Sequence, residues 1–154
     1  MRLLVVIILF VILIGCDSNR VFEDNKDFSK KAWAVNDTVA FEFQIPNEGL
    51  FNVQCDIRNT LDYPYSRIFV NYTLEDSTHK VLTTKLVANY LFDVKTGEPG
   101  GDSGIGDIYD HRFTLESRKF AAGKYFVKLQ QFMRTDTLQG ILAAGVRVET
   151  ISSK

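Results

Sequence analysis

The sequence predicts an all-β protein that folds as one β-sandwich of the jelly-roll type. Apolar and polar residues alternate with a period of two over most of the chain after residue 37, which is the pattern of half-buried strands. Clusters of glycine, proline, asparagine and aspartate interrupt this alternation at short intervals, as the turns of a sandwich do. No segment shows a convincing helical period. These three observations assign residues 38–154 to a single β-sandwich domain.

The first sixteen residues have the organisation of a secretory signal. Arg2 is followed by an unbroken apolar run over residues 3–14, and then by Gly15 and Cys16. As a helix this run would be about 18 Å long against about 30 Å of membrane hydrocarbon, so it is too short for a comfortable span. A basic start, a short apolar run and a small residue before the cleavage point are typical of a signal peptide.

The end of this run, Leu13-Ile14-Gly15-Cys16, resembles the bacterial lipobox, in which signal peptidase II cuts before a cysteine that carries diacylglycerol. The resemblance predicts a signal peptide over residues 1–15 and a mature chain that begins at a lipidated Cys16. Two or three acyl chains anchor a protein firmly, because each buried methylene contributes about 0.8 kcal/mol. An ordinary signal peptide followed by a chance cysteine is the alternative.

Residues 16–37 are expected to form the lipidated N-terminus and a tether between the membrane and the domain. The segment is polar, with many Asp, Asn, Lys and Ser residues. Phe22, Phe28 and Trp33 are its apolar exceptions. We therefore expect the end of the tether to pack onto the domain.

The first half of the domain contains four expected strands. Residues 39–45 and 51–57 alternate on either side of the turn cluster 46–49, and the pair is predicted to form a hairpin. Residues 68–74 form the next alternating stretch. After a turn, residues 81–94 are predicted to form a long and less regular strand region.

The second half begins with a loop over residues 95–107, which contain five glycines and one proline. Strand patterns follow at residues 108–115, 125–131 and 141–151, and a turn at 120–123 separates the first two of these. The chain has no internal repeat and no second domain is expected.

The composition and the motifs argue against nucleic-acid binding and against catalysis. The formal net charge is −1 and the pI is about 6.1, so no basic surface for nucleic acid is predicted. The sequence contains neither G-x-S-x-G nor H-E-x-x-H, and His79 and His111 lack a metal-type partner at short spacing. An enzyme that uses Asp110 and His111 is the catalytic alternative, but no nucleophile supports it.

Carboxylates gather in and around the glycine-rich loop. Asp102, Asp107 and Asp110, together with Asp93, are candidate ligands for Ca²⁺, which prefers oxygen donors. Their spacing is not that of an EF-hand, and Asp is also an ordinary turn residue. We therefore expect no bound metal and no cofactor other than the acyl lipid on Cys16.

Cys55 is expected to be a buried and inert thiol. With Cys16 assigned to lipidation, it is the one remaining cysteine of the chain. It stands among Phe51, Val53 and Ile57 in an alternating stretch, so it shares an apolar strand face with them. A reactive thiol is the alternative.

Three short triplets resemble the D-[ST]-apolar motif that directs O-glycosylation in Bacteroidota. They make Thr38, Ser77 and Thr137 candidate modification sites.

Taken as a whole, the chain resembles the gliding-motility lipoprotein H (GldH) family of Bacteroidota. The resemblance covers nearly all of the mature chain, and the lipobox and Trp33 fit it. Most of the matching residues lie in the second half: Leu91-Phe92-Asp93, Thr96-Gly97, Pro99, Gly104-Ile105-Gly106-Asp107-Ile108-Tyr109, Phe120, Gly123-Lys124-Tyr125, Met133-Arg134, Leu138-Gln139-Gly140-Ile141 and Gly145-Val146-Arg147-Val148-Glu149.

This resemblance implies a membrane-anchored envelope lipoprotein that acts as a non-catalytic structural or assembly component of gliding motility or of the associated type IX secretion machinery. It implies a lipid-anchored location, most simply on the outer membrane facing the periplasm, with other envelope lipoproteins or type IX components as partners. Arg134 and Arg147 match the family pattern and are candidate partner contacts. Their alternative role is to close turns or to pair with acids such as Asp136 and Glu149.

A glycan-binding module on the cell envelope is the alternative function. Jelly-roll sandwiches often bind sugars through aromatic platforms, and five aromatic residues are available for one. These are Trp33, Tyr63, Tyr65, Tyr90 and Tyr109.

Overall fold

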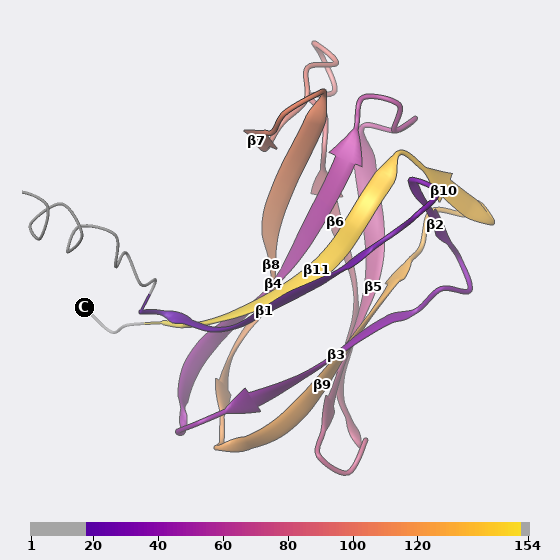
Figure 1. The fold of residues 1–154 in the computed structure, drawn as a ribbon. Helices are drawn as coiled ribbons and strands as arrows, with labels where there is room; N and C mark the ends of the chain where they lie inside the picture. The colour runs from indigo at the N-terminus through magenta and orange to yellow at the C-terminus, as the bar shows by residue number, and fades with distance from the viewer. Residues whose placement is uncertain (1–17, 152–154) are drawn as a thin grey trace, which may run out of the picture.

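Two antiparallel β-sheets pack face to face in the computed structural model, which describes residues 18–151 (Figure 1). The strands of this part of the chain are β1 (Arg20–Asp27), β2 (Ala32–Ala34), β3 (Val39–Ile45), β4 (Gly49–Thr60), β5 (Arg67–Asp76), β6 (Val81–Tyr90), β7 (Asp102–Ser103), β8 (Ile108–Phe120), β9 (Gly123–Gln131), β10 (Thr137–Gln139) and β11 (Ile141–Thr150). The described residues contain no helix long and apolar enough to cross a membrane.

The order of the strands confirms the predicted jelly roll. One sheet has the order β1-β11-β4-β8-β7, the other β3-β9-β5-β6, and β10 and β2 form a small separate ribbon. When the short strands β2, β7 and β10 are set aside, eight strands remain. Numbered along the chain, they occur in the orders 1-8-3-6 and 2-7-4-5, which is the double Greek key of a jelly roll.

Alternating side chains place the core between the two sheets. β3 alternates strictly between buried and exposed residues from Val39 to Ile45. In β4 the same alternation buries Val53, Cys55 and Ile57. Burying each large aliphatic side chain contributes about 1.5–3 kcal/mol, so this period-two pattern supplies the main driving force for folding.

The expected burial of Cys55 is confirmed: its side chain is fully buried, and the burial raises the pKa of the thiol.

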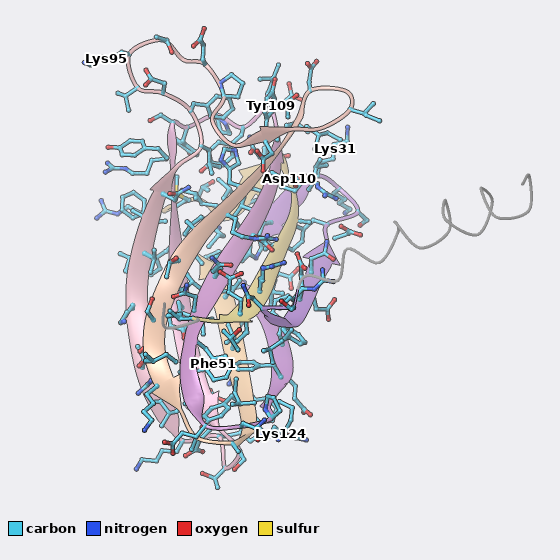
Figure 2. All side chains as sticks on the ribbon, turned by 90° about the vertical axis from the view of Figure 1, so that its left-hand side faces the viewer. Lys31, Phe51, Lys95, Tyr109, Asp110 and Lys124 are labelled. Atoms are coloured by element: carbon cyan, nitrogen blue, oxygen red, sulfur yellow. The ribbon has the colours of Figure 1, made fainter. Side chains whose placement is uncertain are left out.

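Aromatic rings close one end of the sandwich. Phe43 of β3 lies 5.8 Å from Tyr125 and 6.1 Å from Phe120, between ring centroids, and 5.9 Å from Phe22 of β1. Phe51 of β4 meets Phe120 edge to face. These contacts join both sheets, because β3 and β9 belong to one and β1, β4 and β8 to the other. Figure 2 shows Phe51 and Lys124 at this end, opposite Tyr109 and Asp110.

The predicted hairpin between residues 39–45 and 51–57 is wrong. β3 pairs with β9, whereas β4 pairs with β8 and β11 in the other sheet. The turn cluster between them therefore carries the chain from one sheet to the other. Alternation shows which side of a strand is buried, but it does not show which strand is its neighbour, and this explains the error.

The tether expected over residues 16–37 differs from the structure. β1 pairs with β11 from Arg20 to Asp27, and β2 pairs with β10. β1 is polar because it is a largely exposed edge strand, and pairing through the backbone does not require apolar side chains. Phe28 and Trp33 are buried, as expected for the end of this segment. The predicted signal peptide over residues 1–15 and Cys16 lie outside the described residues.

The other strand predictions differ from the structure mainly at their ends. The region predicted over 81–94 stops as a strand at Tyr90. The glycine-rich loop that follows contains the two-residue strand β7, which pairs with β8, and a bridge between Phe92 and Pro99. β10 was not predicted, because three residues are too short for a periodic pattern.

Candidate functional site

A polar groove of about 500 Å³ lies on the outer face of the five-stranded sheet. Its floor contains Ala143 and Gly145 of β11, whose small side groups leave room above the sheet. Its walls are mostly charged and come from β1, β4, β7 and β8. The wall residues are Glu23, Asp24, Asn25, Asp56, Arg58, Asp102, Asp110, His111 and Arg112.

Strand register brings the charges of this groove together. Arg58 and Asp110 lie directly opposite each other on β4 and β8, and so do Asp56 and Arg112. Opposite charges that face each other across neighbouring strands stabilise the pairing of those strands. The sequence alone did not reveal these pairs, because each joins segments more than 50 residues apart.

Arg112 is the centre of the ion-pair network. Its Nε donates to Asp56 Oδ1 at 2.6 Å, and its Nη2 donates to Asp56 Oδ2 at 2.9 Å and to Glu23 Oε1 at 2.7 Å. These bonds, with Asp56 first, raise the pKa of the Arg112 guanidinium. Arg58 makes a second bidentate pair, with 2.7 and 3.2 Å to the two carboxylate oxygens of Asp110.

Glu23 connects the network to β1. Its carboxylate accepts from Arg20 at 2.7 Å, from Arg112 at 2.7 Å and from Arg147 at 3.0 Å. The hydrogen bond from Arg20 and the neighbouring guanidinium charges lower the pKa of Glu23, against the effect of desolvation. The charges of this groove are therefore largely neutralised by one another, and the network fastens β1 to the sheet.

The two candidate partner contacts lie in different settings. Arg147 is buried and lies between Glu23 and Glu149, with 3.1 Å from its Nε to Glu149 Oε2. This geometry favours the alternative role of pairing with acids. Arg134 follows β9 and is exposed, with a positive φ of 54°.

Arg134 borders a second, apolar hollow of about 320 Å³ on the outer face of the four-stranded sheet. Its other lining residues are Phe69, Leu86, Phe132 and Met133. Phe132 and Leu86 are each more than half exposed. This surface is not predicted from the sequence, although the adjacent apolar residues Phe132 and Met133 directly after β9 are a signal for it.

The acidic loop residues have structural roles that compete with metal binding. Asp110 is paired with Arg58, and Asp93 Oδ1 accepts from the backbone N–H groups of Lys95 and Thr96 at 2.8 Å each. These backbone hydrogen bonds lower the pKa of Asp93. Asp102 lies across from Asp110 in the β7–β8 pairing. Over residues 18–151, no three His, Cys, Asp or Glu side chains gather into a group that could hold a metal ion.

Asp107 lies apart from these pairs, at an exposed turn position with a positive φ of 58°. Left-handed backbone of this kind is common for Asp in turns, so a turn role accounts for this residue.

Neither histidine is placed for nucleophilic catalysis. His111 is buried against Gly101, its Nε2 has no hydrogen-bond partner among the described residues, and burial lowers its pKa. His79 lies on the β5–β6 turn, where its Nδ1 is 3.0 Å from Glu75 Oε2 and its ring stacks on Phe126. Within the described chain, no hydrogen bond joins either ring to a serine, threonine or cysteine.

The candidate glycosylation residues are all accessible. Thr38 precedes β3, Ser77 lies in the β5–β6 turn and Thr137 begins β10, and all three are exposed. Accessibility is necessary for modification, so the three remain candidates.

The aromatic residues considered for a glycan platform are dispersed. Trp33 and Tyr63 are buried in the core, and Trp33 Nε1 donates to the Asp37 carbonyl at 2.7 Å. Tyr65 and Tyr90 are exposed, and Tyr109 is half-buried. The polar groove has no aromatic residue among those that line it.

Comparison with known proteins identifies relatives over nearly the whole chain. The sequence profile of the GldH lipoprotein family matches residues 20–148. A curated protein of Christiangramia forsetii, the "Gliding motility lipoprotein GldH homolog", is 31% identical over 157 residues, which cover 94% of each chain.

Solved structures share only a loose overlap with this fold. The pre-peptidase C-terminal domain of a collagenase from Bacillus anthracis is 12% identical, with a TM-score of 0.37, and the match covers 82% of this chain and 87% of that one. A structure of infectious bursal disease virus, Gx strain, is 14% identical, with a TM-score of 0.43, and the match covers 88% and 32%. Overlaps this loose indicate no function.

Proposed function

The chain belongs to the GldH lipoprotein family, and from this membership we propose that it is a non-catalytic assembly component of the gliding machinery or of the associated type IX secretion machinery. It is a lipoprotein associated with gliding motility and with the cell envelope. The single observation that carries the proposal is the family match over residues 20–148, which covers nearly all of the described domain.

The arrangement of side chains supports a non-catalytic role. In the polar groove, arginine and carboxylate side chains neutralise each other and fasten β1 to its sheet. The pKa of Glu23 is lowered and that of Arg112 is raised, so both groups are held in their charged forms and are not poised to exchange a proton. The apolar hollow beside Arg134 offers exposed side chains that a binding partner would cover.

The proposal includes a lipid anchor on Cys16 and a location on the outer membrane facing the periplasm. The lipobox at residues 13–16 supports the anchor. Two or three acyl chains would hold the domain at the membrane without a membrane-spanning segment. No metal or cofactor other than this acyl lipid is needed for an assembly role.

The test is crosslinking in intact cells of the native host, with the wild-type chain and with Cys16→Ala expressed at equal levels. We expect gliding or type IX components to be captured by the wild-type chain and lost with Cys16→Ala. Both forms keep the same β-sandwich, so the comparison isolates the anchor. Recovery of cell-wall or surface glycan alone, without any such protein, would favour the glycan-binding function and overturn the proposal.

Gliding and secretion by a deletion strain provide the second readout. Restoration of gliding or of type IX secretion by the wild-type gene, but not by Cys16→Ala, is expected. A deletion strain that glides and secretes normally would contradict the assembly role. Acyl modification itself is read from the intact mass of the purified protein.

A further inference from the structure

We propose that the free edge of β6, with the apolar hollow beside it, binds an extended segment of a partner protein that presents acidic and apolar residues together on one face, at every second position. The proposal deepens the assembly function above and rests on it. Its three supports are the unpaired strand edge, the exposed apolar side chains and two arginines without a carboxylate partner.

The backbone edge of β6 pairs with no further strand among the described residues, although the side chains of Thr83 and Lys85 contact Arg118 and Glu116 of β8. β6 is the last strand of its sheet and pairs with β5 alone. All ten residues from Val81 to Tyr90 are exposed or half-buried. At the opposite edge of the same sheet, the core side of β3 lies beside β1, where Phe22 packs against Phe41 and Phe43. An open strand edge offers backbone N–H and C=O groups to an added strand.

Apolar side chains extend from this edge across the outer face of the sheet. Leu86 and Tyr90 of β6 are each 54% exposed, and Phe132 is 53% exposed. Leu86 and Phe132 line the hollow of about 320 Å³, whose base contains Phe69 of β5. A neighbouring strand at β6 would place alternate side chains over Leu86 and Tyr90, and a long apolar side chain would reach the hollow.

Two cations without acidic partners border the same apolar surface. The described arginines at 20, 58, 112, 118 and 147 each contact a carboxylate. Arg67 and Arg134, in contrast, have no carboxylate within ion-pair distance among the described residues. The Arg67 guanidinium lies over the rings of Phe69, at 4.9 Å, and Tyr90, at 5.3 Å, so it reaches toward the open edge. Arg134 lines the hollow itself.

These charges decide which occupant fits. A second copy would bring two more unpaired arginines to the same place, and like charges oppose that contact. A lipid surface would cover the apolar side chains, but it would leave the backbone groups of the β6 edge without partners. An acidic and apolar strand satisfies the backbone, the apolar face and both arginines.

The test selects binders from a library of random ten-residue peptides against the full mature chain in detergent. We expect enrichment of sequences in which every second position holds either Asp or Glu or an aliphatic or aromatic residue, because these positions share the outer face of the sheet. The double variant Arg67→Glu/Arg134→Glu should weaken the best peptide by about tenfold or more, the loss of two partly desolvated ion pairs. The same variant should accept a version of that peptide with Lys in place of its acids.

The matched control is Lys119→Glu/Lys124→Glu, which makes the same change in charge on either side of the β8–β9 turn, whereas Arg67 begins β5 and Arg134 follows the far end of β9. These two lysines form exposed pairs with Glu48 and Glu42. The control should bind the peptide with unchanged affinity. Equal urea midpoints for the two double variants would show that both are folded.

Strand addition has a signature that other binding modes lack. Hydrogen exchange of residues 81–90 should slow when the peptide binds, and a peptide with N-methylated backbone amides should lose its affinity. Absence of enrichment, or binding that Arg67→Glu/Arg134→Glu leaves unchanged, would overturn the proposal. Protection of the same residues by phosphatidylglycerol vesicles without peptide would identify a membrane contact instead, and dimerisation through β6 in sedimentation would identify a second copy.

The inference and the assembly function can fail separately. If the peptide binds specifically but no gliding or type IX component is crosslinked in cells, the proposed binding surface is supported and the assembly function is contradicted. If crosslinks to such components persist in the Arg67→Glu/Arg134→Glu strain, the assembly function is supported and this binding surface is contradicted.

Discussion

Gly145→Ala should loosen the attachment of β1 to the five-stranded sheet. Gly145 lies opposite Asn25 in the β1–β11 pairing. A Cβ atom at this position would lie 2.8 Å from the Asp24 carbonyl oxygen and 2.9 Å from Asn25 Cβ. Both distances are shorter than ordinary contacts, and the nearest atom belongs to backbone, so β1 must shift to admit the methyl group.

We expect a net destabilisation of about 1–2 kcal/mol. Forcing a methyl group into a closely packed site costs about 1–3 kcal/mol. The lower backbone entropy of the unfolded Ala variant returns about 0.4–1 kcal/mol. The free energy of unfolding is measured from urea titration of the full chain, and hydrogen exchange of residues 20–27 should accelerate more than that of β4.

Gly100→Ala is the matched control. A Cβ atom at Gly100 would be 3.5 Å from the Leu91 carbonyl oxygen and 3.8 Å from the His111 ring, which are ordinary contacts. This variant should therefore be neutral or slightly more stable. Equal stability of the two variants, with unchanged exchange in β1, would refute the close docking of β1 on β11.

Three further predictions concern the core. Burial holds the pKa of His111 below its usual 6.5, so just below pH 6.5 the unfolded chain binds more protons than the folded chain. The free energy of unfolding should therefore fall as the pH drops from 7 to 5. In urea titrations, His111→Asn should remove that part of the pH dependence. Cys55→Ser should lower the free energy of unfolding by about 1–3 kcal/mol, because it buries a hydroxyl in an apolar site. The native thiol should not react with a thiol reagent until the protein unfolds, and rapid labelling of the native protein would argue against its burial. Phe43→Ala should cost about 3–5 kcal/mol, because Phe43 joins β1, β3, β8 and β9 through ring contacts, and a loss under 1 kcal/mol would contradict that packing.

The sequence predicted the strands that have a buried and an exposed face. It did not predict an exposed edge strand or which strands lie next to each other in a sheet. β3 and β4 were located closely, because each has one face in the core and alternation records that face. β11 was located from the alternation of Val146 and Val148 with Arg147 and Glu149, although most of its residues on both faces are buried. The sequence predicts a tether where β1 lies, because this edge strand is largely exposed and its residues from Glu23 to Asp27 are all polar. The partner sheet of β3 was wrong, because no local pattern encodes a neighbour about 80 residues away.

The same limit applied to the candidate surfaces. The polar groove is assembled from pairs such as Arg112 with Asp56, which only the register of β4 and β8 brings together. Arg134 was singled out from the family resemblance, but its setting beside Leu86 depends on the packing of β6 next to β5. The sequence therefore indicated individual residues, and the fold was needed to show which of them form a common surface.

The pairing of β1 with the sheet limits the distance between the domain and the proposed lipid anchor. With Cys16 acylated as proposed, four Cα–Cα steps separate the anchor from Arg20, a reach of at most about 14 Å, whereas a free segment from 16 to 37 would reach about 70 Å. The domain would then stay against its own leaflet, and partners would have to come to the membrane surface to meet it. A pull on the anchor along β1 would act on the seven residue pairs between β1 and β11 together, in shear. Strand pairs loaded in this direction resist force better than pairs that are peeled open one at a time, which is consistent with the proposed role in the gliding machinery.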